Sequence, residues 1–490
     1  MPRKKGRYKQ NGAVNKRATN KLPLGEQGKT LPPRSGLPVD NAPSPIKDME
    51  KVNLHAAGID IASGVHYVAV PEGRDDTGHV KSFGAFTADL EAIADWLTAC
   101  KIETVAMEST GVYWIPLFEL LEQRGFHVIL VEPSQVKKFR RKTDVLDCQW
   151  IQTLHTFGLL TGSFRPEDRI VVLRSYMRQR ETLTKDCARY VQRMQKAMEQ
   201  MNLKLTGVIS DICGVTGMLI IGAILDGERD PHKLAALRNE KCKNDEATIA
   251  LALQGNYRQE HLYSLRQSVD MYRVFHQKMV EVDREIESYL SQFEDKSDGQ
   301  PLPKLPRSKQ RSKRVNEPKF DTRKLLYEML GVDLTEIDGV KGHSALEIVS
   351  EIGTNVDAFP TEKHFVSWLS LCPEVFKSGG KAPKKGRSPT HRSGNRVAQS
   401  LRVCAQTLLR SKCALGAFGR RIKSRDGAAS AVTAIARKLA IIIYNMIKTG
   451  RAYKDIGAEA YNARYQDRLI RNLQRRAEAL GCELIPSEAL

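Results

Sequence analysis

The chain has 490 residues, of which 41% are hydrophobic, and it carries a formal net charge of +20. This length suits two to four domains, and the hydrophobic content is sufficient for a sizeable core. The nine cysteines are scattered, odd in number and never spaced as CxxC, which excludes a zinc knuckle and a disulfide framework. A basic balance of this size favours an acidic polymer as partner, and nucleic acid first.

The N-terminal stretch, residues 1–51, is basic and rich in proline, and it has too few apolar residues to form a core. We expect it to be a disordered leader, which either adds attraction to phosphate or only keeps the chain soluble. No apolar segment typical of a signal peptide follows it, and apolar runs such as residues 439–444 are too short to span a bilayer. We therefore expect a soluble, cytoplasmic protein that does not contact a membrane.

The segment 52–165 alternates between strand and helix periodicity. It predicts strands at 54–61, 66–70, 80–86, 104–107 and 128–131. Helices are predicted at 89–99, around Leu117 to Leu121, and from about 143 onward. In a ribonuclease-H-type sheet with this order, the first and fourth strands are neighbours. The predicted fold class is therefore α/β in this domain.

Four acids occupy particular places in this pattern. Asp60 lies within an apolar strand, Glu108 ends the fourth strand, and Asp144 and Asp147 lie one turn apart at a helix start. The pair taken by itself is also typical of a solvated helix start with Thr143 as the N-cap. Four convergent carboxylates, however, repel one another unless a divalent cation lies between them. Mg²⁺ prefers such oxygen ligands, and two ions can act together in phosphoryl transfer.

These acids belong to three motifs: GID (58–60), MESTG (107–111) followed by Tyr113 and Trp114, and KTDVLD (142–147). The motifs resemble those of IS110/IS1111-family transposases, whose N-terminal domain is RuvC-like and carries a DEDD set of acids. The resemblance implies catalytic and metal-binding roles for Asp60, Glu108, Asp144 and Asp147.

Two long amphipathic helices are predicted in the helical region 166–294, at about 168–205 and 262–293. They form either a dimerisation arm or an intramolecular hairpin, and we favour a role in oligomerisation. A basic, proline-rich linker (295–322) separates them from a mostly α-helical C-terminal domain (323–455). Residues 337–345 there are typical of a helix-hairpin-helix turn or of a plain tight turn. A basic helical tail (456–490) follows, with no role assigned.

The segment 376–396 contains a Ser-Gly-Gly element, a run of bases and a Gly-Asn-Arg helix start. It resembles the second signature of the IS110 family, the transposase 20 domain, whose proposed serine nucleophile corresponds to Ser378. Ser388 and Ser393 lie in the same loop and are its rivals. Leu-Cys372-Pro373 stands where the family often has Gly-Leu-x-Pro, which affects domain spacing and no catalytic residue.

The resemblance implies a DNA transposase that cleaves and rejoins strands through a serine–DNA link. It also implies a structured guide RNA that pairs with donor and target DNA, a homo-oligomer (dimer or tetramer), and a prokaryotic, nucleoid-associated setting. The alternatives are a Mg²⁺-dependent resolvase or nuclease in which water attacks, and a non-catalytic nucleic-acid-binding protein. The basic residues predicted to bind nucleic acid are Lys137, Lys138, Arg140, Arg141, Lys142, Lys377, Lys381, Lys384, Lys385, Arg387, Arg392 and Arg396.

Overall fold

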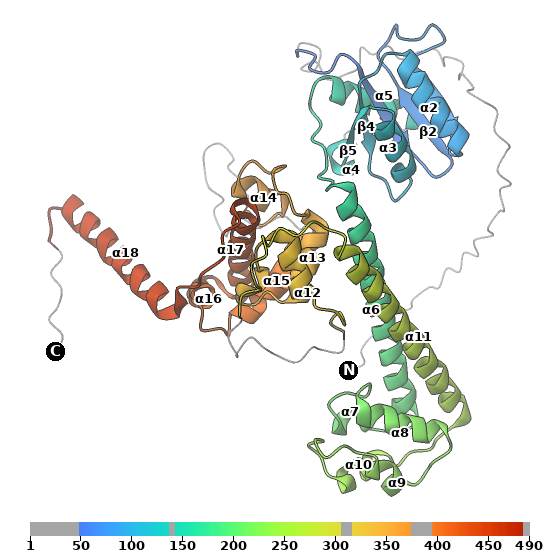
Figure 1. Cartoon of the computed structure of the whole chain (residues 1–490), viewed down its shortest axis with the longest axis vertical. Coiled ribbons are helices and arrows are strands. Elements are labelled where there is room, and N and C mark those ends of the chain that lie inside the picture. The colour runs from blue at the N-terminus through green and yellow to red at the C-terminus, as the bar shows by residue number, and fades with distance from the viewer. Residues whose placement is uncertain (1–48, 137–142, 305–315, 374–393, 484–490) are drawn as a thin grey trace, which may run out of the picture. The chain divides into compact units, whose positions relative to one another are not determined.

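The computed structural model describes residues 49–136, 143–304, 316–373 and 394–483, and the chain divides into two compact units between Phe164 and Arg165 (Figure 1). Several predicted features therefore lie outside the described residues. These are nearly all of the leader, much of the 295–322 linker, Ser378 with its rivals, and every predicted nucleic-acid-binding base except Arg396.

The first unit contains a five-stranded sheet with the strand order β3-β2-β1-β4-β5. Strands β1 and β2 are antiparallel, as are β2 and β3, whereas β4 lies parallel to both β1 and β5. The α/β class is therefore confirmed, as is the predicted adjacency of the first and fourth strands. The strands are β1 (Ala56–Ile61), β2 (Val65–Ala69), β3 (Val80–Gly84), β4 (Thr104–Glu108) and β5 (His127–Val131).

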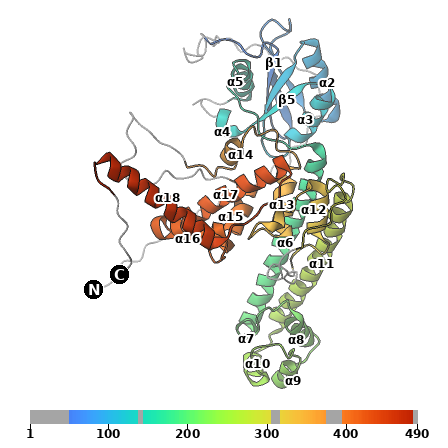
Figure 2. The same ribbon diagram turned by 60° about the vertical axis from the view of Figure 1, so that its left-hand side comes forward.

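Helices cover both faces of this sheet (Figure 2). Successive side chains of a strand point to opposite faces. Ile59 and Met107 belong to one buried cluster with residues of α2 (Thr87–Ala99) and α3 (Trp114–Gln123). Ala106 belongs to a second cluster with Trp150 and Ile151 of α5 (Asp144–Thr156). The sheet is thus the middle of three layers, with α2 and α3 on one face and α5 on the other. A short helix, α4 (Pro133–Val136), follows β5.

Gly58 sets how closely α5 approaches β1. A Cβ atom at this position would lie 2.2 Å from the backbone nitrogen of Gln152 and 2.5 Å from the carbonyl oxygen of Cys148. Since both neighbours are backbone atoms of a helix, neither can move without moving α5 as a whole. The close packing of α5 against β1 therefore requires glycine at position 58, in the first motif.

We predict that Gly58→Ala destabilises the first unit by about 1–3 kcal/mol, the usual cost of forcing an extra methyl group into a packed core. The matched control is Gly64→Ala, because a Cβ there would meet nothing within 4 Å and the backbone is not left-handed. Urea unfolding followed by circular dichroism measures both variants. Equal midpoints for the two variants would contradict the close packing of α5.

The second unit begins with two long helices, α6 (Asp168–Gln200) and α11 (Gln259–Leu290). They lie side by side in Figures 1 and 2 and make extensive contact, as an intramolecular pair. The two predicted helices are confirmed to within a few residues of their ends. Between them the chain forms α7 (Leu205–Val208), α8 (Val215–Leu225), α9 (Pro231–Ala236) and α10 (Glu246–Ala252), which share one apolar core with the ends of α6 and α11.

A buried ion pair joins the two long helices. Arg180 Nε donates to Asp283 Oδ1 at 2.5 Å, and each side chain is only 4% exposed. Arg180 Nη2 also donates to the carbonyl oxygen of Asn316 at 3.0 Å, and Asp283 Oδ2 accepts from the backbone N–H of Lys319 at 3.2 Å. Because both charges are enclosed and hydrogen-bonded, removing one partner would leave the other uncompensated.

We predict that Asp283→Asn destabilises the second unit by about 3–5 kcal/mol, the usual cost of breaking a buried ion pair. The control is Asp186→Asn, which removes an exposed pair with Arg189 and should cost less than about 1 kcal/mol. Thermal and urea unfolding of the full chain measure both. The double variant Arg180→Met/Asp283→Leu should regain most of the loss, and equal midpoints for the two single variants would contradict the expectation.

The remaining helices of the second unit form the C-terminal bundle. They are α12 (Thr322–Leu330), the 3₁₀ helix η3 (Leu334–Glu336), α13 (Gly342–Ile352), α14 (Glu362–Trp368), α15 (Arg396–Leu408), α16 (Ala414–Asp426), α17 (Ala428–Thr449) and α18 (Gly457–Ala479). Helix α15 buries Val397, Leu401, Ala405 and Leu408.

Helix α17 has the length and composition of a membrane-crossing helix, with a mean hydropathy of 1.4 over its most apolar window. In the bundle, however, it contacts α14, α15 and α16. Ile435, Leu439 and Ile443 are buried there, and the Tyr444 hydroxyl donates to the carbonyl oxygen of Phe359 at 2.8 Å. Its apolar residues therefore build a protein core.

Candidate active site

The carboxyl ends of β1 and β4 bring the first two predicted acids together. The parallel register pairs Gly58 with Ala106 and Ile59 with Met107, so the next position on each strand is Asp60 and Glu108. Gly58 and Ala106 both face α5. Because side chains two residues apart share a face, Asp60 and Glu108 point to that same face. They are half-buried neighbours at the carboxyl ends of these two strands.

The other two acids lie in the first turn of α5. The helix begins after Thr143, whose side chain accepts a hydrogen bond from the backbone N–H of Leu146 at 3.3 Å, as predicted for an N-cap. Asp144 is exposed and Asp147 is half-buried. Both carboxylates suit the positive end of the helix dipole, so the local sequence stabilises this helix start as well as placing two acids there.

The pKa of the Cys148 thiol is affected by the acids of this region. The thiol is fully buried next to the start of α5, and burial raises its pKa above the ordinary value. The negative charges of Asp60 and Asp147 raise the pKa of Cys148 further, which places both carboxylates near this sulfur. The close approach of α5 at Gly58 therefore brings acids from β1 and α5 into one electrostatic environment.

A tight turn holds the end of β4. The Thr110 hydroxyl donates to Glu108 Oε1 at 2.9 Å, and both the backbone N–H and the hydroxyl of Ser109 donate to the carbonyl oxygen of Val131. Gly111 adopts φ +59°, a left-handed conformation that suits glycine. The MESTG motif thus orients Glu108 and ties β4 to β5.

Among the described residues, no group of three or more His, Cys, Asp or Glu side chains is arranged to hold a metal ion. The predicted four-ligand site is therefore not assembled in this structure. The donor set nevertheless fits a hard divalent cation. It consists of carboxylates only, and two of them lie side by side at the carboxyl ends of β1 and β4.

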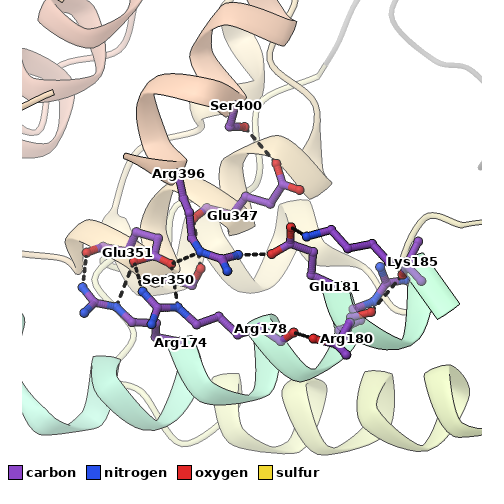
Figure 3. Close-up of polar contacts among 12 residues, drawn as sticks. Arg174, Arg178, Arg180, Glu181, Lys185, Glu347, Ser350, Glu351, Arg396 and Ser400 are labelled. Atoms are coloured by element: carbon purple, nitrogen blue, oxygen red, sulfur yellow. Dashed lines mark hydrogen bonds and ion pairs between the residues drawn. The ribbon is translucent and has the colours of Figure 1, made fainter. Parts of the chain in front are cut away.

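Arg396, predicted to bind nucleic acid, begins α15 and is held by acids of its own chain (Figure 3). Its Nη1 is paired with Glu181 of α6, and its Nε lies 4.0 Å from Glu351 of α13. Burial lowers the pKa of Arg396, and the nearby charge of Arg178 lowers it further. These contacts join α15 to α6 and α13, and the binding of nucleic acid by Arg396 stays a prediction.

Two further arginines surround Glu351. Arg178 contacts both of its carboxylate oxygens at 3.1 Å, and Arg174 Nε lies 3.0 Å from Oε2. Burial lowers the pKa of Arg174 to about 10, although the charge of Glu351 opposes that shift. The sequence reading missed this cluster. The i, i+4 spacing of Arg174 and Arg178 was visible, but their acidic partner lies more than 170 residues away.

A second polar cluster in the bundle was also missed. Glu347 of α13 accepts from the Ser400 hydroxyl at 2.8 Å and lies 3.2 Å from His343 Nε2. Burial opposes ionisation of Glu347, but the hydrogen bonds from His343 and Ser400 prevail and lower its pKa.

Gly339 in the predicted hairpin turn has φ +82°, and a Cβ there would lie 2.9 Å from Leu408. This turn is therefore packed against α15.

Two family models match the chain. A DEDD transposase model of the IS110 type covers residues 57–203, and a transposase model of the IS116/IS110/IS902 family covers residues 333–418. The first match includes all four predicted acids, and the second includes Ser378. No curated protein matches the chain. The DEDD match implies dependence on a divalent metal in general terms and an enzyme that acts on DNA. Together the two matches, which follow one another in sequence order, support an IS110-family transposase.

Proposed function

We propose that the chain cuts and rejoins DNA strands through a covalent bond between Ser378 and a DNA phosphate, with the help of four acids. The observation that carries the proposal is the register of β1 and β4, which makes Asp60 and Glu108 neighbours on the face covered by α5. Acids at the carboxyl ends of these strands suit phosphoryl transfer. The two family matches indicate that the substrate is DNA.

Asp60, Glu108, Asp144 and Asp147 would hold Mg²⁺, and two ions are the expected number. When bound, the metal would stabilise negative charge on the reacting phosphate and on the departing oxygen. The chain itself contributes two features before metal binds. Gly58 permits the close approach of α5, and Thr110 holds the Glu108 carboxylate through its hydroxyl.

Ser378 would supply the attacking oxygen. A bond forms between its Oγ and phosphorus while the bond to one DNA ester oxygen breaks, so the serine loses a proton and the departing oxygen gains one. The phosphate ester is retained, and the reverse attack by a DNA hydroxyl can rejoin the strands. Gly379 and Gly380, which follow the serine, permit close approach of the backbone to a phosphate.

The proposed partners are donor and target DNA, a structured guide RNA and further copies of the chain. Support for a polyanionic partner is the formal charge of +20 and the run of predicted bases around Ser378. Purification of the protein from cells carrying its native flanking DNA, followed by sequencing of bound RNA, tests the guide. Recovery of no structured RNA encoded beside the gene would contradict it.

Trapping the protein–DNA adduct tests the proposed chemistry. The wild-type protein is incubated with Mg²⁺ and labelled DNA carrying the element's junction, then denatured and digested. We expect a denaturant-resistant adduct whose peptide contains Ser378. Cleavage without any adduct would mean that water attacks, as in a resolvase, and binding without cleavage or adduct would favour a non-catalytic protein. An adduct at Ser388 or Ser393 would retain the reaction and correct the residue.

A further inference from the structure

Helix α18 (Gly457–Ala479) lies beyond both family matches, the second of which ends at residue 418. It is 23 residues long, and none of its residues is buried. A helix of this length without a buried face gains little from packing within its own chain. Its sequence pattern therefore has to be explained by something other than the core of the bundle.

The start of α18, as far as Tyr465, is fixed to α16. The Asp455 carboxylate accepts from the backbone N–H groups of Ala414, at the start of α16, and Gly457, at the start of α18, both at 3.1 Å. The Arg421 guanidinium lies 3.9 Å from the ring centroid of Tyr465 and 5.8 Å from that of Tyr461. These contacts hold the base of the helix and leave the following turns exposed.

From Arg464 onward the helix has two opposite faces. Arg464, Arg468, Arg471 and Arg475 follow one another at i, i+4, i+7 and i+11, which confines them to a sector of roughly 60° over roughly 16 Å of helix. All four are exposed. The opposite side carries the exposed apolar residues Leu469, Ile470, Leu473 and Leu480.

The arginines of this face form no ion pair within the part of the chain that the structure describes. Many basic side chains elsewhere, in contrast, are paired with acids. Four aligned guanidinium groups complement a regular row of phosphates. Along roughly 16 Å, B-form DNA presents about ten negative charges.

We propose that the arginine face of α18 binds the phosphate backbone of duplex DNA. The inference rests on the proposed function, since it assigns a contact surface for the same substrate to a segment outside the catalytic domains. Duplex DNA is the occupant that the charge and the family matches favour, because the four exposed arginines follow one side of the helix and transposase families act on DNA. Contacts of this kind position the protein and carry no base specificity.

The test measures affinity of the full chain for a DNA duplex of arbitrary sequence at several salt concentrations. The variant replaces Arg464, Arg468, Arg471 and Arg475 with glutamine, which is also a good helix former. We expect affinity at about 0.1 M salt to fall more than about tenfold and the slope of log K against log salt to flatten by roughly two to four. Single substitutions give a matched pair: Arg471→Gln should flatten the slope by about one, and Arg476→Gln, on the apolar side, should leave it unchanged.

Unchanged affinity and slope in the fourfold variant would overturn the inference. So would a loss confined to an RNA hairpin probe, which would identify RNA as the occupant. The variant Leu469→Gln/Leu473→Gln alters the opposite face and should bind DNA normally. If it changes the molar mass in light scattering while the arginine variant binds DNA normally, α18 is a protein–protein surface. A flat salt response of the wild type would overturn the proposed function as well. If all α18 variants still form the protein–DNA adduct, the proposed function holds even where the inference about α18 fails.

Discussion

Replacement of Ser378 by alanine is expected to abolish both cleavage and joining of DNA while leaving binding intact. The substitution removes one hydroxyl group between a lysine and two glycines, a setting where we expect stability to change by no more than about 0.5 kcal/mol. Without the hydroxyl, no oxygen of the protein can form the phosphate ester. The measurement is denaturing electrophoresis of labelled DNA after incubation with Mg²⁺, with binding followed separately by a mobility shift.

Two matched controls accompany this variant. Ser388→Ala and Ser393→Ala make the same change in the same loop and should retain both cleavage and the adduct. If Ser378→Ala still cleaves DNA in Mg²⁺ without an adduct, water is the nucleophile and the resolvase alternative holds. If one of the control variants is the inactive one, the serine mechanism stands with another residue in the role.

Asp144→Asn should lower the rate of strand exchange at least about a hundredfold, which corresponds to about 2.7 kcal/mol of lost transition-state stabilisation. The change preserves size and removes one of the four negative charges expected to hold the metal. Asp144 is exposed at the start of α5 and Thr143 caps that helix independently, so the fold and DNA binding should be retained. Recombination with purified protein, measured over a range of Mg²⁺ concentrations, tests the expectation.

The control must separate metal binding from the ordinary benefit of an acid at a helix start. Glu246→Gln makes the equivalent change in the first turn of α10, which Asp245 caps. Each substitution should cost no more than about 1 kcal/mol through the helix dipole, but only Asp144→Asn should impair catalysis. Near-normal recombination by Asp144→Asn at every Mg²⁺ concentration would mean that Asp144 is only a helix-start residue.

Local pattern was sufficient to predict the five strands, the main helices of the first unit and the two long helices α6 and α11. Strand alternation around Asp60 and the apolar spacing of the later helices depend on neighbours within a few residues, so they can be read directly. The cap at Thr143 depends on near neighbours for the same reason. The adjacency of Asp60 and Glu108 needed one further assumption, the strand order of a ribonuclease-H-type sheet, and the register of β1 and β4 confirmed it.

The sequence by itself therefore determined the strands and main helices of the first unit, the two long helices, the order of the acids and the basic character of the chain. Only the tertiary structure decided which charges are neutralised and which faces are buried. Arg180 meets Asp283 across 103 residues, and Arg396 meets Glu181 across 215. Arginine is paired with acids at Arg396, whereas Arg471 of α18 has no ion pair with a residue that the structure describes. Ion pairing and burial depend on segments that are distant in sequence, and side-chain periodicity within one helix carries no information about them.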